Sequence, residues 1–344
     1  MTGRPPLLSV ADLRVAFPDG PTGRDVVHAV RDVSFDVSEG EVLALVGESG
    51  AGKSLIARVL LGMAPPTART SGRVRFRGRE LLGAARSGYA GLWGRHLALV
   101  PQDALSVLSP VHTVGDQLAA AVRSVRRVGR AEARAAAVAA LDRVGIADAA
   151  RRAGAYPHEF SGGMRQRAVI AMATINEPDL VVADEPTTAL DPDVREQVLG
   201  LLAALRETTG AGLLLVTHDL DVVARHADRV LVLYAGEVVE YGPVKRVLER
   251  PRAPYTAGLL ASLPPGEPTG SRLLPAIDGS PPSLREAASA PGCVFAPRCP
   301  LAADPCRTRR PAPVEAAAGH LVSCHRRADV PEVPTQLFGA GEAG

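Results

Sequence analysis

The sequence predicts an α/β fold: a mostly parallel sheet with an antiparallel edge layer and an inserted helical subdomain, followed by a small cysteine-containing C-terminal appendage. Continuous apolar runs at residues 180–183 and 213–216, each flanked by helical patterns, are typical of parallel strands buried on both faces. Another apolar run, residues 41–46, leads directly into a glycine-rich loop and then a helix over 54–62. After about residue 251 proline and glycine become dense, and all four cysteines follow, which indicates a second domain.

Local patterns predict the other elements. Residues 7–17 and 28–37 are rich in Val, Leu and Phe and are separated by a turn-forming segment at 18–23, which predicts the antiparallel edge layer. A further strand is expected at 97–100. The Ala- and Arg-rich stretch 114–144 has helical periodicity, so we expect it to be helical.

We expect three segments along the chain. Residues 1–250 form the main domain, with the helical subdomain at about 103–176. Residues 251–327 form the C-terminal extension, and residues 328–344 form a disordered tail. At 344 residues the chain exceeds the roughly 250–300 residues at which single cores stop growing, which supports more than one domain.

Composition narrows the classes of function. Hydrophobic residues make up 46% of the chain, which suits a packed core, but no stretch reaches the roughly 18 apolar residues of a membrane span. The N-terminal residues do not resemble a signal peptide, so we expect a cytoplasmic protein that meets a membrane only through partners. A net charge of +2 argues against a nucleic-acid partner, since nucleic-acid binders concentrate basic residues into a strongly positive surface.

The glycine-rich loop is the first candidate for chemistry. It fits G-x-x-x-x-G-K-[ST], a phosphate-binding loop (P-loop) whose backbone N–H groups surround phosphates, with a Lys for the β and γ groups and a hydroxyl for Mg²⁺. The matching residues are Gly47, Glu48, Ser49, Gly50, Ala51, Gly52, Lys53 and Ser54. Of 39 basic residues only Lys53 and Lys245 are lysine, and a compact ammonium fits this loop where a planar guanidinium would not. The motif alone predicts a nucleoside triphosphatase.

A second glycine-rich helix start follows at Ser161, Gly162 and Gly163, with Gln166 about one turn further on. The free N–H groups and the dipole of a helix start attract phosphate, and glycine permits close backbone approach. One nucleotide rarely needs two such cradles from one chain. We therefore expect this helix start to serve a nucleotide bound to a partner copy.

Asp184 and Glu185 end an apolar run, so both carboxylates emerge at the carboxyl end of a buried strand, where α/β sheets place ligands. A pair that merely caps the segment before a proline is the structural alternative. The presence of Lys53 and Ser54 favours a functional pair, because a phosphate site needs acidic and metal partners.

The order P-loop, Ser-Gly-Gly-x-x-Gln, then an apolar strand ending in Asp-Glu resembles the ABC ATPases, in which two subunits sandwich ATP head to tail. The resemblance implies that Asp184 contacts Mg²⁺ through water and that Glu185 is the base that orients the attacking water. It implies that His218 contacts the γ-phosphate, although a lone histidine is more often structural. Gln102 matches the glutamine that reaches Mg²⁺ and links the site to the transmembrane subunit; without the other motifs it would be an ordinary loop residue.

Two further assignments rest on the same resemblance. Ala189, Leu190 and Asp191 resemble the loop that communicates across the dimer. Phe17 is the aromatic residue expected to stack on adenine. Core packing at the end of an edge strand is an equal alternative for Phe17.

Motifs outside the catalytic set resemble those of the oligopeptide/dipeptide importer ATPases, over nearly the whole chain. They lie at residues 156–167, 234–243, 251–256 and 292–300. The resemblance implies an ATP-binding and ATP-hydrolysing subunit at the cytoplasmic face of the cell membrane that energises peptide import. Its partners would be a homologous ATPase or second copy, two transmembrane permeases and an extracytoplasmic substrate-binding protein. The alternatives are import of nickel or another small solute, and a soluble regulatory ABC ATPase.

Four cysteines lie in the C-terminal segment with the spacing C-x₅-C-x₆-C-x₁₇-C: Cys293, Cys299, Cys306 and Cys324. A cytoplasmic chain disfavours structural disulfides, and four thiolates can hold tetrahedral zinc or a [4Fe–4S] cluster. The lack of a C-x₂-C pair weakens the zinc interpretation, and the resembling importers can carry a cluster in this segment. We therefore favour the cluster, with zinc or unliganded thiols as alternatives, and regard His320 and His325 as structural or surface residues.

Overall fold

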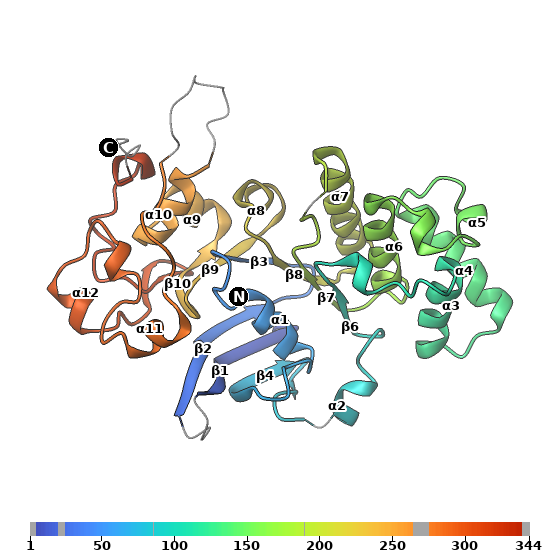
Figure 1. Cartoon of the computed structure of the whole chain (residues 1–344), viewed down its shortest axis with the longest axis horizontal. Helices are drawn as coiled ribbons and strands as arrows, with labels where there is room; N and C mark the ends of the chain where they lie inside the picture. The colour runs from blue at the N-terminus through green and yellow to red at the C-terminus, as the bar shows by residue number, and fades with distance from the viewer. Residues whose placement is uncertain (1–4, 20–24, 85, 189, 264–274, 339–344) are drawn as a thin grey trace.

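The computed structural model describes residues 5–19, 25–84, 86–188, 190–263 and 275–338. A central sheet lies between a helical group at one end of the molecule and the C-terminal segment at the other (Figure 1). None of the helices in these ranges is long and apolar enough to span a membrane. The predicted α/β class is confirmed.

In the described residues the central sheet has eight strands, in the order β11-β12-β10-β9-β3-β8-β7-β6. The strands joined by parallel pairing are β3 (Val42–Val46), β6 (Leu97–Val100), β7 (Leu180–Asp184), β8 (Gly212–Val216) and β9 (Arg229–Tyr234). Every residue of β3, β7 and β8 is buried. Burial on both faces explains why these strands are continuous apolar runs without alternation.

A second sheet forms the antiparallel edge layer, in the order β2-β1-β4-β5. Its strands are β1 (Leu8–Asp19), β2 (Asp25–Val37), β4 (Arg69–Phe76) and β5 (Arg79–Glu80). β1 and β2 pair antiparallel, as predicted. β4 and β5 escape prediction from the sequence because most of their residues are exposed and lack regular apolar alternation.

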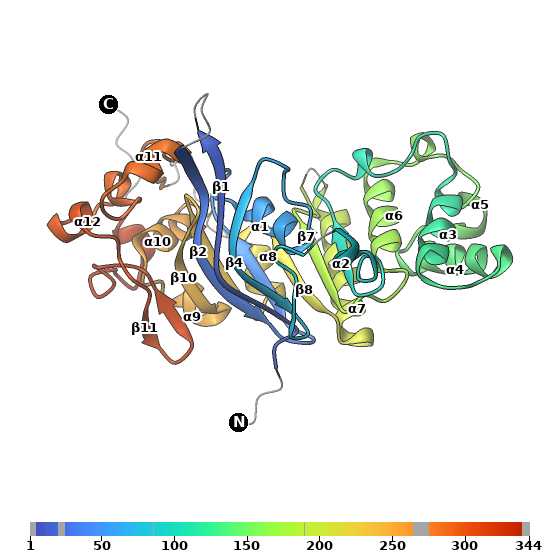
Figure 2. The same ribbon diagram turned by 90° about the horizontal axis from the view of Figure 1, so that it is seen from below.

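Helix α1 (Lys53–Leu60) lies between the two sheets (Figure 2). Four of its side chains are at most 2% exposed and share one core cluster with strands of both layers: Ile56, Ala57, Val59 and Leu60. The helix begins at Lys53, so its first two residues are the last two of the P-loop motif. This shared core therefore fixes the P-loop relative to the central sheet.

The helices expected after β6 are α3 (Val114–Val125), α4 (Arg130–Arg143), α5 (Ala149–Arg152) and α6 (Gly162–Thr174). The predicted helical stretch at 114–144 breaks between α3 and α4, where Arg126 ends one helix in extended conformation and Gly129 precedes the next. α7 (Pro192–Thr209) and α8 (Leu220–His226) follow β7 and β8. Helices α3, α4, α6 and α7 pack with β6, β7 and β8 around a second core cluster.

Short elements complete the main domain. They are α2 (Arg86–Ala90) and the 3₁₀ turns η1 (Ala104–Ser106) and η2 (Pro157–Glu159). The chain then passes through β10 (Glu237–Pro243) and α9 (Val244–Glu249) into the C-terminal segment. The elements of that segment are α10 (Pro254–Ala261), α11 (Leu284–Ser289), η3 (Ala296–Arg298), α12 (Asp304–Thr308), β11 (Val314–Ala317), β12 (His320–Val322) and η4 (Pro334–Gln336).

The C-terminal segment is joined to the main domain rather than appended to it. β12 pairs antiparallel with β10, and β11 pairs with β12, so both strands extend the central sheet. The pairing covers the edge of β10, which would otherwise present unpaired backbone groups. The C-terminal segment therefore shares the central sheet with the main domain, which the sequence patterns do not predict.

A buried contact between two polar side chains supports the junction. His320 Nε2 lies 2.7 Å from Glu240 Oε1, and the two side chains are 4% and 0% exposed. Glu240 also accepts the backbone N–H groups of Arg252 and Ala253, at 2.7 and 3.0 Å. His320 is therefore structural: through Glu240 it links β12 to β10 and to the start of α10.

The last described residues differ from the expectation of a disordered tail at 328–344. Val330 and Phe338 are 5% and 7% exposed and belong to the same core cluster as Tyr255. Phe338 packs beside Gly258 of α10, where an added Cβ would lie 3.1 Å from its ring. Two apolar side chains among polar residues are enough to dock this segment, which an argument from composition overlooks. Residues 339–344 lie outside the described residues.

Candidate nucleotide site

The P-loop connects β3 to α1, and its conformation depends on glycine. Gly47 has a φ of +149°, and a Cβ added there would lie 2.1 Å from the backbone oxygen of Leu233. Gly52 has a φ of +100° and immediately precedes α1. These positions explain two of the glycines in the motif, because other side chains would be strained or would clash there.

Lys53 is confined inside the loop. Its side chain is 5% exposed, and Nζ donates to the backbone oxygens of Gly47 and Glu48 at 2.6 and 3.1 Å. Burial lowers the pKa of Lys53, and the carboxylates of Glu185, Asp184 and Glu48 oppose that shift. The ammonium thus lies where the motif requires a positive charge for phosphate.

Two predicted Mg²⁺ contacts meet between α1 and β7. Ser54 Oγ donates to Asp184 Oδ1 at 2.8 Å. Burial raises the pKa of Asp184, although the hydrogen bond from Ser54 opposes the shift. Hydroxyl and carboxylate oxygens are the hard ligands that Mg²⁺ prefers, and a cation here would stabilise a carboxylate that burial disfavours. The residues therefore fit the predicted ion.

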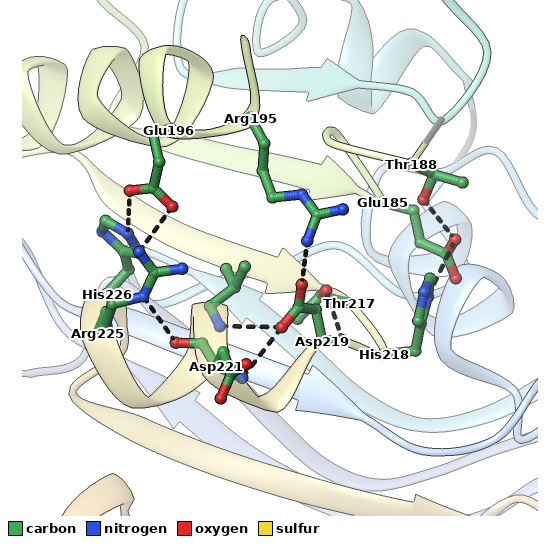
Figure 3. Close-up of polar contacts among 11 residues, drawn as sticks. Glu185, Thr188, Arg195, Glu196, Thr217, His218, Asp219, Asp221, Arg225 and His226 are labelled. Atoms are coloured by element: carbon green, nitrogen blue, oxygen red, sulfur yellow. Dashed lines mark hydrogen bonds and ion pairs between the residues drawn. The ribbon is translucent and has the colours of Figure 1, made fainter. Parts of the chain in front are cut away.

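Glu185 lies at the centre of a polar cluster that Figure 3 shows in part. Its Oε2 accepts hydrogen bonds from Gln102 Nε2 at 3.2 Å and from Thr188 Oγ1 at 2.9 Å. His218 Nδ1 lies 3.6 Å from the same oxygen. The structure thus brings together Glu185, His218 and Gln102, the three predicted catalytic residues.

Sheet order explains why these residues meet. Gln102, Glu185 and His218 follow β6, β7 and β8, which are neighbours in the sheet and run parallel. The carboxyl ends of parallel neighbours lie at one edge, which is where ligands bind in such sheets. Residues far apart in the sequence therefore converge because of strand register.

The backbone of Glu185 is strained. Its φ is +47°, in the left-handed region that non-glycine residues seldom adopt, at a cost of about 1–3 kcal/mol. Its N–H donates to the backbone oxygen of Val216 in the adjacent β8, at 2.9 Å. Such strain persists only where surrounding structure imposes it, and it is concentrated at functional sites.

A second polar network holds the segment that carries His218 (Figure 3). Asp219 caps α8 by accepting the N–H groups of Asp221 and Val222, at 3.0 and 3.2 Å. Arg195 of α7 donates to the other carboxylate oxygen of Asp219 at 2.6 Å. No sequence motif identifies Arg195 or Thr188 as supporting residues. Their signal is local only: Thr188 follows the Asp-Glu pair by three residues, and Arg195 lies in the first turn of α7.

The second glycine-rich helix start lies at the surface. Ser161 is the N-cap of α6, and its Oγ accepts the N–H of Met164 at 3.3 Å. Ser161 and Gly162 are exposed, whereas a Cβ on Gly163 would meet Val194 of α7 at 2.8 Å. The helix start is therefore open to a partner at Ser161 and Gly162, and Gly163 permits close packing against α7.

The other predicted site residues lie below the surface, against a core cluster or at the start of α7. Gln166 is 4% exposed, so its side chain lies beneath the surface that Ser161 and Gly162 form. Phe17 is half-buried and packs against the main core, as the structural alternative proposed. Asp191 caps α7 by accepting the N–H of Val194 at 3.0 Å, and Leu190 packs against the second core cluster. Ala189 lies outside the described residues.

All four cysteines line one small cavity, of about 30 Å³. Cys306 is buried and the other three are half-buried. Burial raises the pKa of Cys293, that of Cys299 to about 11 and that of Cys324 to about 12. Within the described residues, no group of three or more His, Cys, Asp or Glu side chains is arranged to hold a metal ion. The thiols converge on one cavity, but in this conformation they do not form a ready ligand set.

Two parts of the chain match known protein families. Residues 30–188 match the family described as "ABC transporter", and residues 239–306 match "Oligopeptide/dipeptide transporter, C-terminal region". Over 320 residues the chain is 43% identical to the "Dipeptide transport ATP-binding protein DppD" of Bacillus subtilis, with 92% of this chain and 94% of the relative covered. The chain belongs to the ABC transporter ATPases.

Other relatives agree with this assignment. The ABC chain is 51% identical over 323 residues to the "Oligopeptide transport ATP-binding protein OppD" of Mycobacterium tuberculosis, covering 93% of this chain. It spans only 52% of that relative, about half its length. A solved "Dimeric Structure of MJ0796, a Bacterial ABC Transporter Cassette" matches with a TM-score of 0.62 and 27% identity, over 69% of this chain and 98% of that one.

ATP binding by this ABC protein should depend on the backbone conformation of Gly47. Gly47→Ala should lower the affinity for ATP by about a hundredfold or more, because its Cβ would overlap the backbone oxygen of Leu233. Gly129→Ala is the control, since an added Cβ there meets no atom within 4 Å and its φ is −68°. Titration with a fluorescent ATP analogue measures both. Near-native affinity of Gly47→Ala would show that this loop conformation is not needed for binding.

Proposed function

We propose that this chain is the ATP-hydrolysing subunit of an ABC importer for peptides. The convergence of Gln102, Glu185 and His218 on one sheet edge, beside Lys53, is the observation that carries the hydrolytic part. The C-terminal match over residues 239–306 supports the importer part. Relatives named for oligopeptide and dipeptide transport support a peptide as the solute.

The side chains divide the chemistry between them. Glu185 is the general base that takes a proton from the attacking water, and His218 and Gln102 orient that water and the γ-phosphate. Lys53 and the P-loop amides stabilise the charge that develops on the phosphate oxygens. Ser54 and Asp184 would hold Mg²⁺, which supplies further charge neutralisation when bound.

A complete site needs a second ATPase, either another copy or a homologue. Ser161 and Gly162 are exposed at the start of α6, and their free N–H groups suit the phosphates of a nucleotide held by the partner. Leu190 and Asp191, with Ala189 outside the described residues, belong to the loop that faces the partner. ATP therefore closes the pair head to tail.

The assembly includes two transmembrane permeases and an extracytoplasmic substrate-binding protein, and the chain acts at the cytoplasmic face of the membrane. Transport of nickel or another small solute uses the same ATPase chemistry, and a soluble regulatory ATPase is the rival class. Purification of the intact complex, followed by identification of its bound solute, separates these possibilities. A chain that copurifies with no membrane subunit contradicts the importer proposal.

Glu185→Gln should keep ATP binding but lower hydrolysis by about 10²–10⁴-fold, because the amide preserves shape and cannot accept the proton. Glu196→Gln is the matched control: Glu196 pairs with Arg225 in the neighbouring network and does not contact Glu185 (Figure 3). Phosphate release by the assembled transporter is the measurement. Normal turnover by Glu185→Gln would exclude Glu185 as the base.

Ser161→Arg should leave nucleotide bound to the isolated subunit but prevent the ATP-dependent dimer, because a bulky cation would occupy the cradle offered to the partner. Ser124→Arg adds the same side chain at an exposed position of α3 and should change neither property. Nucleotide titration and light scattering measure the two steps. A variant that dimerises with ATP like the native chain would contradict the head-to-tail role.

The four cysteines are proposed ligands of a [4Fe–4S] cluster, with zinc as the alternative. The fit is chemical: four sulfur donors and no disulfide surround one cavity, and binding would require the thiols to lose their protons. The cavity that the four cysteines line is small, about 30 Å³.

Protein purified without oxygen should contain about four iron and four sulfide per chain and be brown. Cys324→Ser should reduce both, because a hydroxyl is a poorer iron ligand, whereas Ser323→Ala should not. Metal analysis and absorbance spectra provide the readout. One zinc per chain would favour the alternative, and no bound metal would leave the cysteines as ordinary thiols.

A further inference from the structure

The P-loop is held from outside the main domain, by a residue of the C-terminal segment. Arg298 Nη1 and Nη2 donate to Glu48 Oε2 and Oε1 at 2.8 and 3.1 Å. The arginine side chain is 7% exposed. Two parallel charge-assisted hydrogen bonds fix direction as well as distance, so Arg298 sets the position of the Glu48 side chain.

Arg298 is itself held firmly. Nε donates to the backbone oxygen of Asp278 at 2.8 Å, and Nη2 also lies 3.3 and 3.2 Å from the backbone oxygens of Ile277 and Gly279. Nη1 also lies 3.3 Å from the hydroxyl of Tyr234. The guanidinium therefore has little freedom to turn, and it transmits the position of the C-terminal segment to the P-loop.

A second contact reaches the same P-loop residue. The backbone N–H of Glu48 donates to the hydroxyl of Tyr255 at 2.8 Å. Tyr255 is 1% exposed, and its ring lies 4.6 Å from that of Tyr234 and 5.3 Å from that of Phe295, between centroids. The side chain and the backbone of Glu48 are thus hydrogen-bonded to Arg298 and Tyr255, two residues of the C-terminal segment.

These contacts adjoin the cysteine cavity. Tyr255, Phe295 and Ala296 line it together with the four cysteines. Arg298 ends η3, directly before Cys299, and η3 is held by bonds from Ala296 N–H to Cys293 oxygen and from Cys299 N–H to Ala296 oxygen, at 3.0 and 3.3 Å. A change in the backbone positions of Cys293 or Cys299 therefore moves η3, which ends at Arg298.

We propose that Arg298 and Tyr255 are positioning residues for the P-loop, and that through them the state of the four-cysteine cavity is coupled to nucleotide binding. This proposal rests on nucleotide binding by the P-loop, and it adds a route by which a ligand or modification at the thiols changes that binding. Coupling between two sites is reciprocal. Nucleotide must therefore change the behaviour of the thiols.

Charge gives Arg298 a specific role. Glu48 places a carboxylate within the loop that receives a polyphosphate, and its charge is close enough to affect Lys53. Arg298 neutralises that carboxylate and holds it by both oxygens. Loss of Arg298 leaves an unpaired negative charge beside the nucleotide, which repels it. Neutralising Glu48 should then remove the repulsion.

The first experiment measures binding of ADP with Mg²⁺, which is not hydrolysed, to the full chain. Arg298→Ala should weaken binding by about tenfold, the effect of one lost charge-assisted contact. Arg310→Ala is the matched control: Arg310 also joins the C-terminal segment to the main domain, through Glu237 of β10, away from the P-loop. It should bind ADP normally. The double variant Glu48→Gln with Arg298→Ala should regain most of the lost affinity.

Circular dichroism checks that each variant is folded, and Arg298→Lys, which keeps the positive charge, covers the case in which Arg298→Ala does not fold. Arg298→Lys should lose less affinity for ADP than Arg298→Ala, because an ammonium still neutralises Glu48 but cannot bind both carboxylate oxygens in parallel. Equal losses for Arg298→Ala and Arg310→Ala, or no recovery in the double variant, would overturn the assigned role of Arg298.

The second experiment uses the thiols as the reporter. The chain has four cysteines, all in this cavity, so total reaction with N-ethylmaleimide reports on the cavity alone. Saturating ADP should slow the labelling of the native chain severalfold, both with its native metal content and after chelation. In Arg298→Ala, at equal occupancy of the nucleotide site by ADP, the labelling rate should change much less. Labelling that ADP leaves unchanged would refute the coupling. Absence of ADP binding to the native chain would instead contradict the proposed function.

Discussion

The parallel register of β6, β7, β8 and β3 is the constraint on which the rest of the structure depends. The P-loop, Gln102, the Asp184–Glu185 pair and His218 each follow one of these strands. Backbone hydrogen bonds fix the strands side by side, and packing on both faces opposes slippage, because a shift of one residue would move side chains from one core cluster into the other. The site is accordingly assembled by the core, and Arg195, Asp219 and Thr188 hold its side chains once the strands have placed them.

Two side chains of the site, Lys53 and Asp184, lie where burial disfavours their charged forms. Burial lowers the pKa of Lys53 and raises that of Asp184, so each would be easier to bury in its neutral form. Mutual attraction opposes both pKa shifts, and the hydrogen bond from Ser54 also opposes that of Asp184. Glu185 adds a strained backbone to the same edge of the sheet. A polyphosphate and a divalent cation would supply the compensating charges, which accounts for a cluster that stability alone does not favour.

The C-terminal segment shows where division by composition fails. Proline and glycine density marks a change in sequence at about residue 251, yet β12 completes the central sheet, His320 pairs with Glu240 and Arg298 binds the P-loop. Composition reports how a segment folds locally. It does not show whether an edge strand or a carboxylate elsewhere in the chain needs a partner. Here the segment supplies a partner strand for β10, and Arg298 pairs with Glu48 of the P-loop.

By itself the sequence determined the fold class, the P-loop and the identity of the residues at the strand ends, because these depend on short-range patterns: apolar runs, glycine spacing and the motif that follows each strand. The tertiary structure decided what no local pattern encodes. It brought Gln102 and His218 to the same carboxylate oxygen of Glu185. It also buried Gln166 and Phe338 and paired Arg298 with Glu48. Those contacts join positions up to 250 residues apart, and the physical reason is that strand order and shared burial, rather than sequence neighbours, select their partners.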